Sequence, residues 1–164
     1  MLIEMEISAL AIDPTMNMPF VILKNGDGTQ MLPIWIGILE ASAIAMQLEK
    51  VELARPMTHD LMKNILDGLD AKVEKILIND LADNTYFARI FIKAGERALE
   101  FDARPSDSMA LALRTGAKIY VEQNVIDKSR KIDSTAKQIP IADKDKWLEI
   151  LENMDPEDFG KYKM

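Results

Sequence analysis

Hydrophobic and polar residues alternate with a period of two along residues 2–13, which predicts a β-strand that ends at Asp13-Pro14. A second apolar run at 20–23 is followed by Asn25-Gly26-Asp27-Gly28, where glycine and asparagine tolerate the positive φ of a tight turn, so we expect a hairpin. Pro33 lies in the returning strand and favours an edge position there. The remaining strands are expected at 31–36, 73–81, 85–93, 97–101 and 119–121.

The pattern changes to helical spacing in three segments, 38–51, 58–69 and 106–114. Alanines at three alternate positions of the first segment predict a helix that approaches a neighbour closely. The second segment carries one apolar face, and the third is apolar on almost every side, which predicts a buried helix. The apolar face of the second segment consists of Leu61, Met62, Ile65, Leu66 and Leu69.

These elements predict an α+β fold: one compact domain over residues 1–125, with a mixed, mainly antiparallel sheet packed against about three helices. Residues 126–164 are expected to form a C-terminal helical extension. Its apolar stripe, formed by Trp147, Ile150, Leu151 and Met154, predicts a helix that docks on the body or on another subunit.

Composition narrows the possible chemistry. The 164 residues contain no cysteine and a single histidine, which excludes thiolate metal sites, cysteine nucleophiles and most nucleophilic triads. A formal net charge of −7 lacks the basic character that drives non-specific binding of nucleic acid, so such a partner needs a local basic patch or bridging metal ions. Acidic residues near the N-terminus argue against a secretory signal, and no apolar stretch is long enough to span a membrane; we expect a cytoplasmic protein.

Two Arg-Pro steps each run into the start of a predicted helix, at 55–60 (Arg-Pro-Met-Thr-His-Asp) and at 102–107 (Asp-Ala-Arg-Pro-Ser-Asp). Proline disfavours helical geometry for the residue before it, so each arginine is expected in extended chain. Thr58 and Ser106 are expected as N-caps, each followed by an acidic residue in the first turn. Each element therefore holds a guanidinium beside a helix N-terminus, where backbone N–H groups and the helix dipole favour anions.

Three interpretations of these elements remain open at this point. In the structural one, caps and acidic residues stabilise helices, and Arg55 and Arg104 pair with Asp60 and Asp107. In the second, the two arginines and the helix N-termini, with Thr58 and Ser106 as contacts, hold a substrate phosphate. In the third, carboxylates bind a divalent metal ion that engages phosphate, with His59 as ligand or proton carrier. The candidate metal ligands are Asp60, Asp107, Asp102 and Glu40.

The ordered motifs resemble the bifunctional nuclease domain family over about residues 1–125. The resemblance rests on Leu-Pro-Ile-Trp-Ile-Gly at 32–37, Glu-Ala at 40–41, Ala-Ile-Ala at 43–45, and both Arg-Pro elements with the residues that follow them, to 61 and to 112. It implies a compact α+β domain and nuclease activity on both DNA and RNA. No catalytic set is carried over from the family, so the site residues rest on the motif positions and their chemistry.

Together these observations favour a metal-dependent phosphodiesterase that acts on nucleic acid and forms a homo-oligomer, most simply a dimer. Mg²⁺ or Mn²⁺ is expected to polarise the phosphate and activate water. His59 would carry a proton, while Arg55 and Arg104 would stabilise developing negative charge. The rivals are a non-catalytic regulatory module that binds an anion or a partner's carboxylate, and a structural oligomer braced by its Arg-Pro elements.

Overall fold

The computed structural model describes residues 1–14 and 16–129, so the C-terminal stripe around Trp147 lies outside the described residues. Seven strands and four helices are found in this part of the chain. The strands are β1 (Leu2–Asp13), β2 (Met18–Asn25), β3 (Met31–Trp35), β4 (Ala71–Ala82), β5 (Thr85–Ala94), β6 (Arg97–Ala103) and β7 (Lys118–Glu122). The helices are α1 (Ile38–Leu48), α2 (Thr58–Gly68), α3 (Pro105–Thr115) and α4 (Gln123–Ser129).

One mixed sheet in the order β3-β2-β1-β7-β4-β5-β6 contains all seven strands. The sheet contains two antiparallel meanders, β1-β2-β3 and β4-β5-β6, and short turns connect the strands within each. Strand β7 lies between the meanders, antiparallel to β1 and parallel to β4. The expected α+β class and the hairpin after Asn25 are confirmed, with Gly28 at φ 74°. Pro33 lies in β3, which is an edge strand, as expected. An edge strand tolerates proline because it has no neighbouring strand on one side that would need the N–H.

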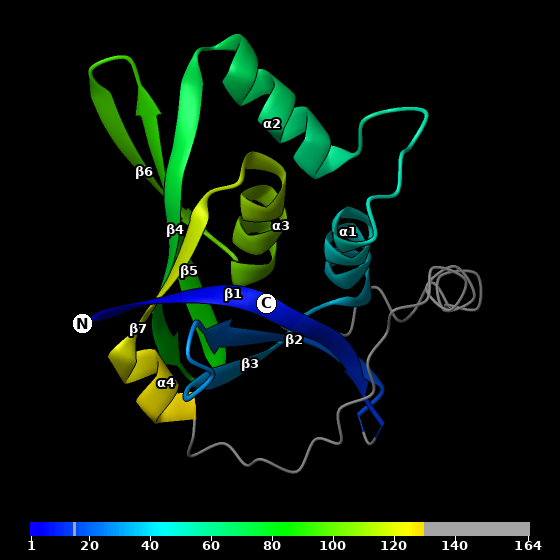
Figure 1. Ribbon diagram of the computed structural model, residues 1–164, viewed down its shortest axis with the longest axis vertical. Coiled ribbons are helices and arrows are strands. Elements are labelled where there is room, and N and C mark those ends of the chain that lie inside the picture. The colour runs from blue at the N-terminus through cyan, green and yellow to red at the C-terminus, as the bar shows by residue number, and fades with distance from the viewer. Residues whose placement is uncertain (15, 130–164) are drawn as a thin grey trace.

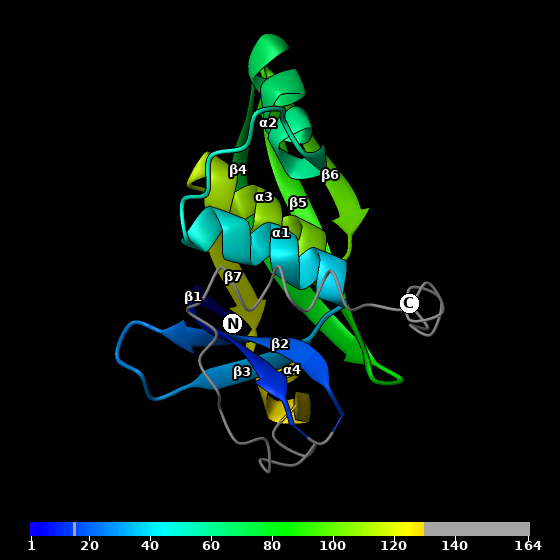
Figure 2. The same cartoon turned by 90° about the vertical axis from the view of Figure 1, so that its right-hand side faces the viewer.

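Helices α1, α2 and α3 lie on one face of the sheet, and Figures 1 and 2 show α1 and α3 lying alongside each other. Small residues allow this close approach, because Ala41 of α1 and Ala110 of α3 are both completely buried. The apolar character of α3 is explained by its position, since it also contacts α2, β4 and β5. The predictions that α1 approaches a neighbour closely and that α3 is buried are therefore confirmed.

The sheet curls strongly, so that its edge strand β3 meets β5 near one end. The hydroxyl of Tyr86 at the start of β5 donates to the carbonyl of Pro33 at 3.1 Å, and burial raises the pKa of Tyr86 to about 12. The turn from β3 into α1 and the turn from β6 into α3 thereby approach each other. This curvature positions the site described below.

The helices add two features that the sequence analysis did not give. Only part of the apolar face of α2 packs on the core: Met62 and Leu66 do, whereas Leu61, Ile65 and Leu69 are at least half exposed. The second is α4, a fourth helix that begins directly after β7 and that the sequence analysis did not predict. Its seven residues contain two buried apolar side chains, Val125 and Ile126, too few to produce a readable periodicity. None of the four described helices is long and apolar enough to cross a membrane.

Candidate functional site

The second Arg-Pro element forms the N-terminus of α3, as its sequence indicates. Arg104 has extended φ and ψ of −71° and 145° and is the N-cap residue, while Pro105 occupies the first helical turn, where its missing N–H costs nothing. The expectation that Ser106 caps this helix is wrong: Ser106 lies inside the first turn, and no side chain caps the helix. The proline ring displaces the helix start by one residue because its φ is already helical.

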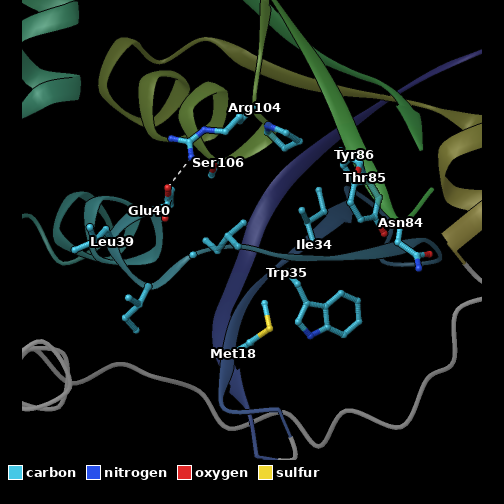
Figure 3. Close-up of a pocket in the computed structure, with 14 residues that line it drawn as sticks. Met18, Ile34, Trp35, Leu39, Glu40, Asn84, Thr85, Tyr86, Arg104 and Ser106 are labelled. Atoms are coloured by element: carbon cyan, nitrogen blue, oxygen red, sulfur yellow. Dashed lines mark hydrogen bonds and ion pairs between the residues drawn. The ribbon is translucent and has the colours of Figure 1, made fainter. Parts of the chain in front are cut away.

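Arg104 joins two helices through its guanidinium. Its Nε donates to Asp107 Oδ2 in the first turn of α3 at 2.7 Å. Its Nη1 donates to Glu40 Oε1 in the first turn of α1, also at 2.7 Å, as Figure 3 shows. Glu40 reaches this position because the residue that precedes the helix has no side chain. A Cβ at Gly37 would lie 2.1 Å from Glu40 Oε2, so the carboxylate folds back over this glycine.

His59 of α2 contacts the other oxygen of Asp107. The distance from His59 Nε2 to Asp107 Oδ1 is 3.0 Å, and the histidine side chain is only 10% exposed. Burial raises the pKa of Asp107, but hydrogen bonds from His59 and Arg104 outweigh burial and lower this pKa to about 2. Asp107 is therefore a carboxylate at neutral pH, held between an imidazole and a guanidinium.

An ionised Asp107 determines which nitrogen of His59 carries the proton. A carboxylate only accepts hydrogen bonds, so the ring must present N–H at Nε2, and neutral His59 then has a lone pair at Nδ1. Among the described residues Nδ1 of His59 has no hydrogen-bond partner. In this part of the chain the buried side-chain atoms without a partner are Trp35 Nε1 and Asn79 Oδ1, so Nδ1 is not fully buried. A carboxylate orients the histidine of hydrolase triads through the same kind of contact.

The first Arg-Pro element has a different structure. Arg55 is exposed in the loop between α1 and α2, without a hydrogen bond or ion pair to the rest of the described chain. The N-cap of α2 is Met57, so the expectation that Thr58 caps this helix is also wrong. Asp60 replaces the cap from inside the helix, because its Oδ2 accepts the backbone N–H of Met57 at 2.9 Å.

Asp60 pairs with a residue that the sequence analysis did not select. Arg114, in the last turn of α3, donates from Nε to Asp60 Oδ1 at 2.6 Å, and its other nitrogens donate to the carbonyls of Ala110 at 2.9 Å and Ala43 at 3.1 Å. Its side chain is 5% exposed. Burial raises the pKa of Asp60, but Arg114 and the N–H of Met57 lower it overall. The available signal was an arginine ending an otherwise apolar helix, which also suits a helix C-terminus and so pointed to no partner.

The candidate metal ligands do not converge. Within residues 1–14 and 16–129, no three His, Asp or Glu side chains lie close enough together to hold a metal ion. Glu40 and Asp107 share Arg104, Asp60 is bound by Arg114, and Asp102 is exposed on β6, opposite Arg89 in register. The donor set as arranged does not fit Mg²⁺ or Mn²⁺, which take several oxygen ligands, so no step below passes through a metal.

A pocket of about 360 Å³ opens beside this site, between β3, the N-terminal turns of α1 and α3, and the start of β5 (Figure 3). We call it the Trp35 pocket. Its polar wall contains Glu40, Arg104 and Ser106, and β3 contributes Ile34 and Trp35. The other lining residues are Met18, Ile34, Trp35, Ile36, Gly37, Ile38, Leu39, Asn84, Thr85, Tyr86 and Pro105. The sequence analysis predicted none of the aromatic lining, because the curl of the sheet brings β3 and β5 together.

Known proteins share this sequence pattern. The family model described as "Bifunctional nuclease domain" matches residues 21–134. An uncharacterised protein of Mycobacterium tuberculosis is 35% identical over 164 aligned residues, which cover 95% of this chain and 97% of the relative. Bifunctional nuclease 2 of Arabidopsis thaliana is 30% identical over 75% of this chain, and bifunctional nuclease 1 of the same plant is 30% identical over 71%; the matches cover 40% and 38% of these plant proteins. The chain therefore belongs to the bifunctional nuclease domain family.

Proposed function

We propose that this protein hydrolyses phosphodiester bonds of nucleic acid, with His59 as general base. The observation that carries this proposal is the continuous hydrogen-bonded chain His59–Asp107–Arg104–Glu40, which comes from three helices and ends at the Trp35 pocket. Membership of the bifunctional nuclease domain family supports the reaction class.

In the proposed reaction, His59 Nδ1 takes a proton from a water molecule as the water oxygen attacks phosphorus. The bond from phosphorus to one sugar oxygen breaks, and that oxygen takes up a proton from solvent. Asp107 keeps the Nε2 proton in place and stabilises the imidazolium that forms. Arg104 is the cation nearest this pair in the hydrogen-bonded chain, so it would stabilise charge on the phosphate oxygens. A requirement for Mg²⁺ or Mn²⁺ and assembly into a homodimer remain predictions from the sequence.

The test is cleavage of single- and double-stranded DNA and RNA by purified protein, with Mg²⁺, Mn²⁺ or EDTA. We expect His59→Gln to lower cleavage by two orders of magnitude or more, since general base catalysis contributes about 10²–10⁴-fold. Asn64→Ala, an exposed position on the same helix, is the matched control and should cleave as the wild type does. Equal cleavage by all three proteins would reveal a contaminating nuclease and reject the proposal.

The same contacts also favour a second function, a structural brace. Arg104 and Arg114 tie α1, α2 and α3 together, and both arginines are already compensated by carboxylates. If these contacts are only a structural brace, His59→Gln and Asp107→Asn should lower the melting temperature without any effect on cleavage of nucleic acid. A nuclease predicts loss of cleavage by His59→Gln in a protein that melts within a few degrees of the wild type.

A further inference from the structure

We propose that the sheet face opposite the helices binds single-stranded nucleic acid through aromatic and basic side chains. We call this surface, formed by β7, β4, β5 and β6, the open sheet face. The inference rests on the proposed function, because it names the substrate class of that reaction. Binding can be measured without cleavage, so each of the two proposals can fail alone.

The open sheet face is the side of these strands that α1, α2 and α3 leave uncovered. Successive side chains of a strand point to opposite faces, and along β5 the buried Ala88, Ile90 and Ile92 belong to the core beneath the helices. The residues between them therefore point away from the helices. Figure 1 shows α1, α2 and α3 all on one side of β4, β5 and β6.

Aromatic and basic residues alternate along β5 on the open sheet face, in the order Phe87, Arg89, Phe91 and Lys93. The side chain of Phe87 is 40% exposed, so a flat base can stack on its ring. In sheets that bind single-stranded RNA, exposed aromatic residues stack on bases, and a positively charged surface follows the phosphates. One strand of this sheet therefore offers both kinds of contact.

Lysines on this face are placed against one another across the strands. Lys72 of β4 is directly opposite Lys93 of β5, and Lys75 of β4 is opposite Lys118 of β7. Like charges directly opposite each other in an antiparallel pair destabilise a sheet. Lys72 and Lys93 have no hydrogen bond or ion pair in the described part of the chain to compensate for this. Bound phosphates would relieve the repulsion, so this cluster provides a local basic patch in a protein of net charge −7.

Aromatic rings hold one of these lysines on the face. The Nζ of Lys75 lies 4.8 Å from the centre of the Phe91 ring and 5.9 Å from that of Tyr120 on β7. An ammonium group in this position is attracted by the rings and keeps its charge. The cation is therefore positioned at the surface of the sheet before a phosphate arrives.

Two of the basic residues are paired with exposed carboxylates that a phosphate can replace. Arg89 pairs with Glu100 on β6, and Lys118 pairs with Glu4 on β1. All four side chains are at least 43% exposed. Exposed ion pairs contribute little free energy, so Arg89 and Lys118 can exchange a carboxylate for a phosphate at small cost.

The open sheet face is connected to the candidate site at one edge of the sheet. β6 is the edge strand, and it leads directly into Arg104. The start of β5 lines the Trp35 pocket and is followed at once by Phe87. A single strand on the open sheet face reaches Arg104 by passing around β6. A duplex is stiff and its bases are paired, so it can neither stack on the rings nor follow this path.

The test measures binding of fluorescein-labelled oligo(U) and oligo(dT) of about 12 nucleotides, a length in the range of such surfaces, by fluorescence anisotropy. A duplex of equal length is measured in parallel. The His59→Gln protein in EDTA is used, so that the oligonucleotides stay intact. We expect saturable binding of both single strands and at least tenfold weaker binding of the duplex.

The first variant tests stacking. In this background Phe87→Ala should weaken single-strand binding about tenfold, because it removes the ring on which one base stacks. Phe87→Tyr keeps the ring and should bind as the parent protein does, which separates stacking from folding. Phe101→Ala is the matched control and should not weaken binding. Phe101 is 49% exposed, but it is opposite the buried Ile90 in register and so lies on the helix side of the sheet.

The second variant tests the phosphate contacts. Lys93→Gln should lower the slope of log Kd against log salt concentration by about 0.7, the contribution of one phosphate contact on a single strand. Its melting temperature should be equal to or above that of the parent protein, because the substitution removes the like charge opposite Lys72. Lys50→Gln, at an exposed position in the segment between α1 and α2, is the control and should keep the slope.

The outcomes separate the two proposals. Absent binding, equal affinity for duplex and single strand, or affinity that Phe87→Ala or Lys93→Gln lowers no more than its control does would overturn the inference. Binding on the open sheet face without cleavage by the wild type rejects the nuclease and retains the face. Cleavage by the wild type, with binding that ignores both substitutions, rejects the face and retains the nuclease.

Discussion

The two Arg-Pro elements resemble each other in sequence and differ in structure. Arg104 is the N-cap of α3 and donates to Glu40 and Asp107, whereas Arg55 lies two residues before the N-cap of α2, is exposed and has no partner in the described chain. The acidic residue of the second element binds its own arginine. The acidic residue of the first, Asp60, binds Arg114 from the far end of α3.

This difference shows that an Arg-Pro step determines local geometry but not partners. Proline places each helix start, and the acid in the first turn follows from the helix dipole in both elements. The partners depend on what lies across from each helix end. The N-terminus of α3 faces that of α1, which carries Glu40, whereas the N-terminus of α2 lies near the C-terminal turn of α3, which carries Arg114.

The largest expected effect concerns the ion pair between Asp60 and Arg114, which is found where a pair between Asp60 and Arg55 was expected. Arg114→Met should lower the free energy of unfolding by about 3 kcal/mol, because removing one member of a buried ion pair leaves Asp60 and two carbonyls without their donor. Urea denaturation measures the change. Lys118→Met removes an ion pair of two exposed side chains, with Glu4, and should leave the unfolding midpoint almost unchanged. Equal effects of both substitutions would contradict the assignment of Arg114 as a buried brace.

The second effect concerns acid stability. The pKa of Asp107 is about 2 in the folded protein against an ordinary 3.8, so its ionised form stabilises the fold. This contribution, about 2 kcal/mol, is fully present above about pH 4 and is lost as the pH falls towards 2. Asp107→Asn should therefore destabilise the protein at pH 7 and much less near pH 2, in denaturant titrations at both values. Asp102→Asn, at an exposed position, is expected to keep the wild-type dependence on pH; if Asp107→Asn keeps it too, the pairing with His59 and Arg104 contributes nothing.

The third prediction compares the two arginines directly. Arg104→Met should cost about 1 kcal/mol of unfolding free energy, less than Arg114→Met because the side chain of Arg104 is 45% exposed and solvent screens its ion pairs. Arg55→Met should change the unfolding midpoint by no more than the experimental error, since Arg55 has no partner to lose in the described chain. Thermal melts of the two variants measure this difference, and a larger loss for Arg55→Met would reverse the comparison.

The smallest expected effect isolates Glu40. Gly37 has φ −70°, so alanine fits its backbone, but the new Cβ must push the Glu40 carboxylate away from Arg104. Gly37→Ala should cost less than about 1 kcal/mol, because the carboxylate is the free end of a flexible side chain. In a protein that already carries Gly37→Ala, the substitution Glu40→Gln should not lower the free energy of unfolding further. A double-mutant cycle measures this. Gly26→Ala, with nothing within 4 Å of its Cβ position, is the control; additive effects at 37 and 40 would show that the glycine does not position Glu40.

Much of the fold could be predicted because the signals were local. Alternation in 2–13, the turn at Asn25-Gly26 and the apolar spacing of α3 each depend on near neighbours in sequence, and all three predictions are confirmed. The predicted caps were wrong by one residue at Thr58 and by two residues at Ser106. A helix can be stabilised from within, as Asp60 does for α2, or begin at a proline, as α3 does, and either removes the need for a capping hydroxyl.

The candidate site was only partly predictable. His59, Glu40, Arg104 and Asp107 were all selected from the sequence, and the structure brings these four together, while Arg55 and Asp102 lie apart from them and Asp60 belongs to a separate pair. Arg114 and Trp35 were missed. An arginine that ends a helix is ordinary, and Trp35 lies in the 32–37 motif, which carried the family resemblance but indicated no chemistry.

The sequence by itself determined where the chain turns, which segments form strands and helices, and that two guanidiniums lie beside helix starts, since these depend on backbone sterics and side-chain periodicity over a few residues. Tertiary structure alone decided that one of these arginines has two carboxylates and the other none among the described residues. It also decided that His59 faces Asp107, 48 positions further along the chain, and that β3 curls towards β5 to form a pocket beside them. Such contacts depend on how the helices pack across the sheet, which no local pattern records.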